Sequence, residues 1–319
     1  ERHGWGAEPV IAPALLTLAE TTIWTGEFGE GERWLRRAAR ALEADDAPGI
    51  RLRLHLASGM LHAGRGCPRE ALEEFRAAGH LRPQLASSLV LGAQVTGWLL
   101  ATQARLGLTG EARAGLAALA DDKAGTGEIR NARAVICLAD GDPAGALRAV
   151  RDVLDGTAPV IGCGTVIEAQ LLAGLAYRAM GDRCAANQST ERALALAEAD
   201  RLVLPFAMTG SRELLEALPR HQTAHAALLT DILDFLSGSS APAGDRRPLP
   251  PVHELSPGEL RVLRYLPTNM SRPQIASELS VSVNTVSTHI RSIYAKLGAE
   301  DRSAAVHRAR ALRLLSAVR

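Results

Sequence analysis

The sequence predicts an all-α protein, an array of stacked helix pairs followed by a small four-helix domain. Three observations support this prediction. Hydrophobic residues make up 47% of the 319-residue chain and aromatic residues only 3%, a composition typical of helices that pack through Ala, Leu and Val. A glycine followed five residues later by an alanine recurs through residues 1–236, and residues 255–315 hold four short helical patterns in a row. A chain of this length can form two or three domains, each with its own core.

The two parts of the chain differ in charge. The net charge is +1, from 36 Lys and Arg against 35 Asp and Glu. Residues 251–319 hold ten basic and five acidic residues, a net charge of +5, which leaves 26 against 30, or −4, for the rest. A basic excess concentrated on the C-terminal part indicates a nucleic-acid partner.

Residues 1–236 predict a repeated unit of helix, tight turn and helix. The glycine and alanine recur as Gly66 and Ala71, Gly107 and Ala112, Gly141 and Ala146, and Gly181 and Ala186, with an imperfect copy at Gly29 and Trp34. Counted from Gly29, the intervals are 37, 41, 34 and 40 residues. The glycine is expected to end one helix, and the alanine to let the next helix pack closely against it.

Such helix pairs bury their apolar faces only by stacking, which gives a solenoid with a concave surface. The spacing resembles that of tetratricopeptide repeats, although most of the aromatic positions usual in those repeats are missing. Four tryptophans are candidates for a ligand groove on this surface, and the alternative is that they lie in the core. They are Trp5, Trp24, Trp34 and Trp98.

The segment after the repeats predicts two further helices, Leu202–Leu218 and His221–Leu236. Residues 237–254 are rich in Gly, Ser, Ala and Pro and predict a flexible linker, partly stiffened by proline. The predicted domains are therefore a helical-repeat sensor or interaction domain at residues 1–236, the linker at 237–254, and a C-terminal domain at 255–319.

The C-terminal domain begins with two helices that each carry a capping box. Ser256-Pro257-Gly258-Glu259 starts the first, and Ser271-Arg272-Pro273-Gln274 starts the second. A third helix is expected from Ser282 to Leu297. The residues between the second and third helices are too few for anything but a tight turn, so the pair predicts a helix-turn-helix, which points to DNA.

The third helix has one apolar and one polar face. Its apolar residues are spaced three and four apart and predict a buried stripe of Val283, Val286, Ile290, Ile293 and Leu297. The opposite face is centred on Asn284, Thr288, Arg291 and Ala295, with Thr285 and Ser287 at its edges. Such a face fits the major groove, where Arg291 is the candidate for guanine and Asn284 for adenine. Arg272 is a further candidate for a DNA contact.

Several strings resemble the LuxR-type DNA-binding domain: Leu-Ser-Pro-Gly-Glu-Leu-Arg-Val-Leu, Ser-Arg-Pro-Gln-Ile-Ala, and the run from Ser282 to Gly298, followed by Arg302 and Ala305. The resemblance implies that Thr285, Ser287, Thr288, Arg291 and Lys296 face DNA. It also implies that the fourth helix, Ser303–Leu315, is where two domains pair, and the pairing face expected there is Ala304, Ala305, Ala309 and Leu312. The chain departs from the family at Ser287, where lysine or arginine is usual, and at Arg313, where glycine is common.

Degenerate helical repeats followed by a LuxR-type domain resemble the C-terminal half of MalT-like, ATP-dependent regulators. In that family a nucleotide-binding domain precedes the repeats, and the chain, which opens without methionine in a helical region, is expected to be a piece of a longer protein. Neither Lys123 nor Lys296 lies in a P-loop context, so no cofactor is expected in this chain. The four cysteines have no Cys-x-x-Cys spacing and follow no signal peptide, which indicates reduced thiols in the cytoplasm.

Other patterns give weaker signals. The uncharged run Ala86–Ala104 contains Ser, Thr and Gln and predicts a buried helix, with no membrane contact. His221 and His225 lie one helical turn apart with no third ligand nearby, so no metal site is expected. Gly125-Thr126-Gly127 and Gly162-Cys163-Gly164 lack the preceding strand of a phosphate loop and predict connections between repeats. No nucleophile has a positioned base, so the chain is not expected to be an enzyme.

The predicted function is that of a bacterial, sequence-specific DNA-binding transcriptional regulator. Its partners are double-stranded DNA, a second copy of the chain on DNA, and an unknown effector or protein partner at the repeats, which controls pairing of the DNA-binding modules. Two alternatives remain open. One is a protein-interaction scaffold whose C-terminal bundle docks on protein, as the related helix-turn-helix of sigma-factor domains allows, and the other is the non-catalytic half of a signal-transducing NTPase.

Overall fold

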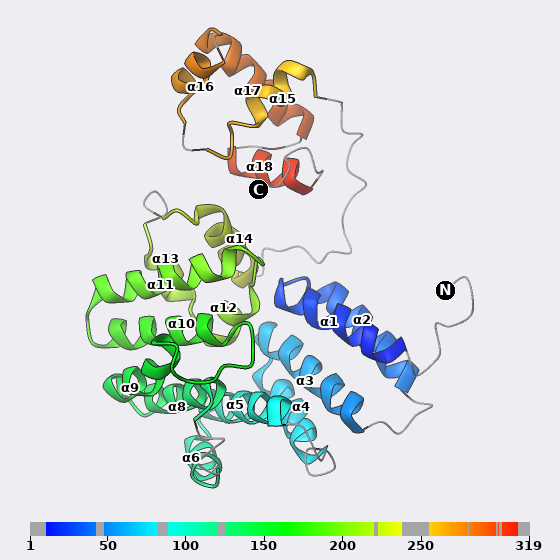
Figure 1. The fold of residues 1–319 in the computed structure, drawn as a ribbon, viewed down its shortest axis with the longest axis vertical. Coiled ribbons are helices and arrows are strands. Elements are labelled where there is room, and N and C mark those ends of the chain that lie inside the picture. The colour runs from blue at the N-terminus through cyan, green and yellow to red at the C-terminus, as the bar shows by residue number, and fades with distance from the viewer. Residues whose placement is uncertain are drawn as a thin grey trace. The chain divides into compact units, whose positions relative to one another are not determined.

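The computed structural model describes residues 11–42, 48–81, 89–119, 125–219, 223–237, 255–268, 270–279, 281–297, 299 and 302–311. These residues belong to two compact units, residues 1–245 and 246–319 (Figure 1). Every regular element in the described ranges is a helix, which confirms the all-α prediction. The division between the units falls inside the predicted linker 237–254, of which all but Ser237 lies outside the described residues.

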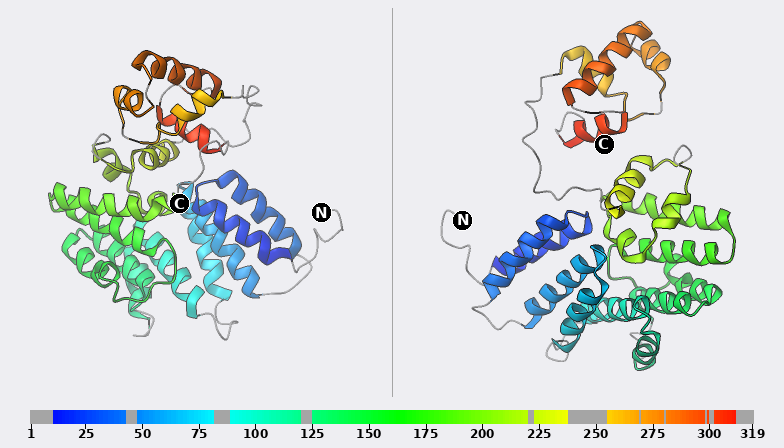
Figure 2. Two further views of the ribbon diagram at one scale, coloured as in Figure 1. Left: turned by 45° about the horizontal axis from the view of Figure 1, so that its top comes forward. Right: turned by 180° about the vertical axis from the view of Figure 1, so that it is seen from behind.

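In the first unit, the described residues up to Glu198 form five helix pairs that follow one another along the chain (Figures 1 and 2). The pairs are α1 (Ala12–Trp24) with α2 (Phe28–Leu42), α3 (Pro48–Gly64) with α4 (Pro68–Leu81), α5 (Leu89–Arg105) with α6 (Thr109–Ala117), α8 (Gly127–Ala139) with α9 (Pro143–Leu154), and α10 (Thr165–Ala179) with α11 (Arg183–Glu198). Each pair contacts the next, as stacking of repeats requires.

The turn inside each pair is made by a glycine in the left-handed region. Gly66, Gly107, Gly141 and Gly181 have φ between +73° and +83°, where a side chain would be strained. The N–H of the residue after the glycine donates to the carbonyl five residues back, as from Cys67 to His62 at 2.9 Å, which closes a Schellman turn. The repeat pattern in the sequence therefore located four of the five turns.

The first turn lies three residues before the position that the sequence predicted. Gly26 has φ +85°, and Glu27 N–H donates to the Thr22 carbonyl at 2.8 Å, whereas Gly29 lies within α2. The residue five positions after the true turn glycine is Gly31, and a Cβ there would lie 2.7 Å from Ile23 Cγ1. The prediction of Gly29 and Trp34 as the first copy was wrong, because this crossing is tight enough to need glycine where the other pairs have alanine.

The alanine of each later pair is buried against the preceding helix. Ala71, Ala112 and Ala146 are completely buried, and Ala186 is nearly so. Their small side chains bring the two backbones of a pair close together, and Leu, Val and Ile fill the space on either side.

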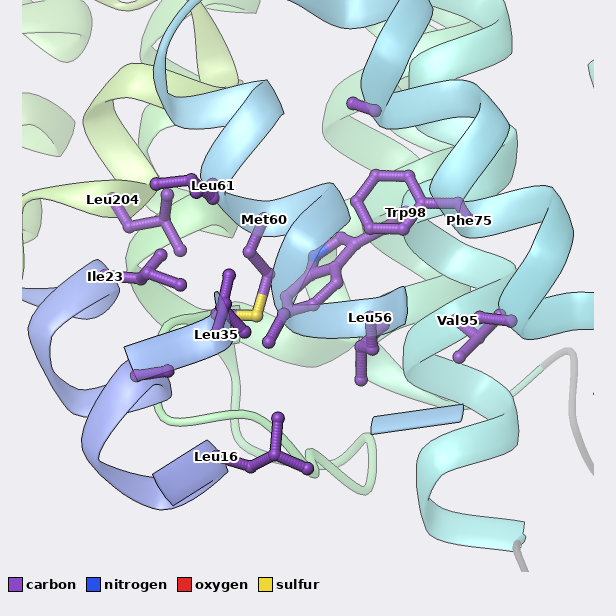
Figure 3. Close-up of a cluster of buried hydrophobic side chains, with 14 of the residues drawn as sticks. Leu16, Ile23, Leu35, Leu56, Met60, Leu61, Phe75, Val95, Trp98 and Leu204 are labelled. Carbon is purple, nitrogen blue, oxygen red and sulfur yellow. The ribbon is translucent and has the colours of Figure 1, made fainter. Parts of the chain in front are cut away.

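The tryptophans are divided between core and surface. Trp98 is buried in the hydrophobic core formed mainly by α1 to α5. Its ring centroid lies 5.9 Å from that of Phe75, and it is close to Met60 (Figure 3). Trp24 is half-buried with its ring centroid 6.2 Å from that of Trp98, and half-buried Trp34 lies under the Arg37 guanidinium. Trp5 lies outside the described residues.

After the repeats, the described residues up to Ser237 form three short helices: α12 (Leu204–Thr209), α13 (Arg212–Ala217) and α14 (Ala226–Leu236). The single helix predicted at Leu202–Leu218 is thus two helices, because Gly210 adopts φ +67° and ends the first. The second predicted helix begins at Ala226 rather than His221, and His225 Nδ1 lies 2.7 Å from Glu198 Oε2. His221 lies outside the described residues, among which no group of metal-ligating side chains was found.

Helix α12 connects the last repeat back to the first. It packs on α10 and also on α1 and α3, where Leu204 enters the core of the first repeats (Figure 3). The Val203 N–H donates to the Trp24 carbonyl at 2.8 Å, and Phe235 of α14 meets Phe28 edge to face. The array in this unit is therefore closed on one side by its own C-terminal helices.

The described residues of the second unit form four helices: α15 (Pro257–Leu263), α16 (Arg272–Glu278), α17 (Val283–Leu297) and α18 (Arg302–Ala311). Their shared core is made of Val262, Leu263, Leu266, Ile275, Ala276, Val286, Ile290, Ile293, Leu297, Ala305, Val306 and Ala309. Among the described helices of both units, α5 included, none has the length and apolarity that crossing a membrane requires.

Candidate nucleic-acid interface

Hydrogen bonds at its N-cap fix the start of helix α17. Ser282 is its N-cap, and its hydroxyl accepts a hydrogen bond from the Thr285 N–H at 3.0 Å. The Thr285 hydroxyl lies 2.8 Å from the same Ser282 oxygen. The preceding helix α16 is capped in a similar way, since Gln274 Oε1 accepts from the Ser271 N–H at 2.7 Å. Both predicted helix starts are thus found in the helix-turn-helix.

The apolar stripe of α17 is shorter than predicted. Val286, Ile290, Ile293 and Leu297 are buried in the core of the unit. Val283, in the first turn of the helix, is 43% exposed. Its assignment to the buried stripe was wrong, and it lies with Val281 at the exposed start of α17.

The polar face of α17 is open to solvent. Asn284, Thr288, Arg291 and Ala295 are all exposed, as is Thr285, while Ser287 is half-buried. The Thr288 hydroxyl donates to the Asn284 carbonyl at 3.0 Å, so it is held against the helix. Within the described residues, the side chains of Asn284 and Arg291 make no hydrogen bond, and both are available to a partner. Arg272, at the start of α16, is exposed as well.

The carboxylate of Glu259 joins α15 to α17, a role that the sequence did not predict. Glu259 is buried, and its Oε2 accepts from the Ser256 N–H at 2.6 Å and from Lys296 Nζ at 2.8 Å. Its Oε1 accepts from the Ser292 hydroxyl at 2.5 Å. The sequence identified Glu259 only as half of a capping box, because the residues that complete its shell lie a long way along the chain.

The charge on Glu259 is stabilised by this shell. Burial alone would raise the pKa of the carboxyl, but the hydrogen bonds from Lys296, Ser292 and Ser256 outweigh burial and lower its pKa from 4.5 to about 2. The prediction that Lys296 faces DNA is corrected accordingly: its ammonium is directed at Glu259 and holds two helices together.

Arg302 is a second cross-link that the sequence pattern did not assign. Its guanidinium donates to four backbone carbonyls, those of Tyr265, Leu266, Thr268 and Met270, at 2.7 to 3.1 Å. These carbonyls lie where α15 ends and the connection to α16 begins, a region whose acceptors have no helical partner. Arg302 therefore fixes α18 against the helix-turn-helix.

The predicted pairing face on α18 is not a free surface. Ala305 and Ala309 are completely buried in the domain's own core, because they pack on α17. Ala304 is exposed, and Leu312 lies outside the described residues. Ala305 and Ala309 are thus core residues of one domain, and their assignment to an interface between two domains was wrong.

Comparison with known proteins agrees with this geometry. The sequence model of the luxR family of bacterial regulatory proteins matches residues 253–309. These residues form a LuxR-family helix-turn-helix domain. The match ends within α18, so it covers the capped helices α15 and α16, the exposed face of α17 and the Arg302 cross-link.

Two known proteins are similar to the LuxR-type domain. A protein of Mycobacterium tuberculosis described as "Probable transcriptional regulatory protein NarL" is 47% identical over 68 residues, which are 21% of this chain and 31% of that protein. The Fimbriae Z protein of Salmonella typhimurium is 39% identical over 69 residues, 22% of this chain and 31% of that protein. The chain thus spans about a third of the length of these relatives. The likeness of the repeats to MalT-like regulators stays a prediction.

Proposed function

We propose that the LuxR-type domain binds double-stranded DNA in a sequence-specific way and that the chain acts as a transcriptional regulator. The observation that carries the proposal is the exposed polar face of α17 in a domain whose helices are held together by Glu259 and Arg302. A rigid helix with short polar residues at its N-terminal end fits the major groove. The relative described as a probable transcriptional regulatory protein supports the same function.

The contacts divide by chemistry. Arg291 has a free guanidinium on the exposed face and is proposed to read guanine, and Asn284 is proposed to read adenine. Thr285, Ser287 and Thr288 carry short side chains that fit close to the DNA backbone, and Arg272 is proposed to bind a phosphate from the start of α16. The binding is proposed to need no catalysis and no cofactor in this chain.

The repeats are proposed to sense an effector or bind a partner and thereby to control pairing of two DNA-binding domains. Pairing on two half-sites multiplies the limited affinity of one recognition helix. Because Ala305 and Ala309 are core residues, the pairing surface is proposed to use the outward side of α18 rather than those alanines.

The proposal is tested with two arginines of one domain. Arg291→Ala is expected to weaken specific binding by roughly 1–3 kcal/mol and to relax one base preference. Arg261→Ala, an exposed change of equal charge on α15, is expected to lower binding to specific and random DNA alike. Fluorescence anisotropy with both DNA types at two salt concentrations gives the comparison. Equal losses on both DNA types for both variants would contradict base reading by Arg291, and absence of salt-dependent DNA binding by the native chain would favour the scaffold alternative.

A further inference from the structure

A polar cluster lies between α8 and α10 in the interior of the repeat unit. Glu128, Asn131, Thr165 and Glu168 are each no more than 9% exposed. Glu128 and Asn131 lie one turn apart on α8, and Thr165 and Glu168 one turn apart on α10. Buried carboxylates are uncommon in a core of alanine and leucine, so the hydrogen bonds of this cluster must account for them.

The carboxylate of Glu128 is satisfied on one side only. Its Oε1 accepts from the N–H groups of Ile161 and Gly162, at 2.8 and 2.9 Å, and from the Thr165 hydroxyl at 2.7 Å. Its Oε2 is buried and has no hydrogen-bond partner. One oxygen therefore holds the connection between α9 and α10 in place, and the other faces the interior without a donor.

Asn131 repeats this arrangement one turn later. Its amide nitrogen donates to the Thr165 carbonyl at 2.9 Å, and its Oδ1 is buried without a partner. Both unpartnered atoms are acceptors on residues that bind Thr165. A buried acceptor without a donor destabilises the fold, so a group that brings hydrogen-bond donors fits this position. Gln170 Oε1, on α10, is also buried without a hydrogen-bond partner.

The charge of the cluster favours a cation. Burial, and to a smaller extent the charge of Glu128, raise the pKa of Glu168 to about 7, although Arg105, Asn131 and the Trp98 indole N–H act in the opposite direction. Burial raises the pKa of the Cys163 thiol, and the charges of Asp200 and Glu168 raise it further. The buried cluster thus holds two carboxylates, and the Arg105 guanidinium acts on one of them, Glu168.

We propose that Glu128 Oε2 and Asn131 Oδ1 receive the primary ammonium group of a small organic amine. This inference rests on the proposed sensing role of the repeats and names the chemical class of the effector. The segment Pro159–Cys163, held by Glu128 Oε1 through Ile161 and Gly162, is exposed or half-buried and connects the cluster to the surface. A bound cation favours ionised Glu168, so binding near neutral pH releases a proton.

The probe is methylammonium, measured against the whole chain by ligand-observed NMR and titration calorimetry at constant ionic strength. Tetramethylammonium supplies charge without N–H donors, acetamide supplies donors without charge, and potassium supplies a metal cation. Methylammonium is expected to bind at least about tenfold more tightly than each of the three. Its affinity is expected to rise from pH 6 to pH 8, with a proton released into the buffer.

Two variants test the roles of Glu128 and Glu168 separately. Glu128→Gln keeps Oε1 for the segment at Ile161 and Gly162 but places a donor at the unpartnered position, and is expected to weaken methylammonium about tenfold. Glu168→Gln is expected to bind with an affinity that no longer changes with pH and without proton release. Glu111→Gln, an exposed carboxylate on α6, is the matched control and is expected to change nothing. Melting temperatures show whether each variant folds.

Equal binding of potassium or acetamide would overturn the proposal in favour of a metal ion or a neutral donor. Absence of binding by methylammonium, with the chain folded, would overturn it in favour of an ordered water. DNA binding is measured on the same samples. If methylammonium does not bind while Arg291-dependent DNA binding is intact, this inference alone is contradicted. If methylammonium binds while Arg291-dependent DNA binding is absent, the proposed DNA function alone is contradicted.

Discussion

At the scale of single residues, Glu259 and Arg302 hold the helices of the LuxR-type domain together, and neither belongs to the exposed polar face of α17. Glu259 joins α15 to α17 through Lys296 and Ser292, and Arg302 joins α18 to the end of α15. The capping residues Ser256 and Ser282 could be predicted because their partners lie three residues away. Lys296 could not be placed, because no local pattern shows that a lysine on α17 is turned toward α15.

The first prediction concerns the pH dependence of stability. The pKa of Glu259 is lowered from 4.5 to about 2, so its stabilising contribution is present above about pH 4.5 and is lost as the pH falls toward 2. After allowance for solvent close to the surface of a small domain, the contribution is about 2 kcal/mol. Chemical unfolding between about pH 5 and pH 2 is expected to show this loss, and Glu259→Gln is expected to lack it. Exposed Glu278→Gln is the control and keeps the full loss.

The second prediction follows from the correction to Lys296. Lys296→Met leaves the buried Glu259 charge without its ammonium partner and is expected to destabilise the C-terminal domain by about 2–4 kcal/mol. The double variant with Glu259→Gln is expected to recover part of this loss, because no charge is then left unpaired. Unfolding curves of the two single variants and the double variant give the coupling. A Lys296→Met domain of full stability that binds all DNA more weakly would restore the phosphate-contact role.

The third prediction concerns Arg302. Its planar guanidinium donates hydrogen bonds to four carbonyls at once, which the three N–H groups of a lysine ammonium cannot do. Arg302→Lys and Arg302→Ala are therefore both expected to destabilise the domain, by about 2 kcal/mol or more. Arg308→Lys, on the same helix, is the comparison and is expected to have little effect. Equal stability of the two lysine variants would contradict the role of the guanidinium.

At the scale of elements, the glycines in the turns decide where each helix pair folds back. The recurrence of glycine and alanine predicted the later pairs because it records the two local requirements of the turn, a left-handed residue and a small residue at the crossing. It failed at the first pair, where Gly29 fitted the spacing but Gly26 makes the turn. Gly26 and Gly29 are only three residues apart, and the residue at the helix crossing is glycine instead of alanine. The spacing alone therefore does not show which of the two glycines makes the turn.

The fourth prediction tests this register. Gly26→Ala is expected to destabilise the repeat unit by at least about 1 kcal/mol, because Gly26 has φ +85° and its Cβ would lie 3.2 Å from Val203. Gly29→Ala is expected to be neutral or to stabilise by up to about 1 kcal/mol, because Gly29 lies within α2 with no atom within 4 Å of its Cβ. Thermal unfolding of the two variants checks the difference, and the opposite order would restore the predicted turn.

At the scale of the whole molecule, composition and repeats were sufficient to predict an all-α chain with a helical array and a C-terminal helix-turn-helix. The return of α12 to α1 and α3 was not predictable, because it depends on contacts such as Val203 with Trp24 between opposite ends of the array. The same is true of the polar cluster between α8 and α10. Its residues are unremarkable in the sequence and become a candidate site only when the fold buries them together.

The most direct test of the central claim is selection of DNA sequences from a random pool by the whole chain and by its Arg291→Ala variant at two salt concentrations. We predict that the native chain enriches a motif, that the variant loses it, and that affinity falls with salt at a slope of about −0.9 per phosphate contact. Enrichment of no motif by the native chain, or of the same motif by both proteins, would contradict sequence readout by α17.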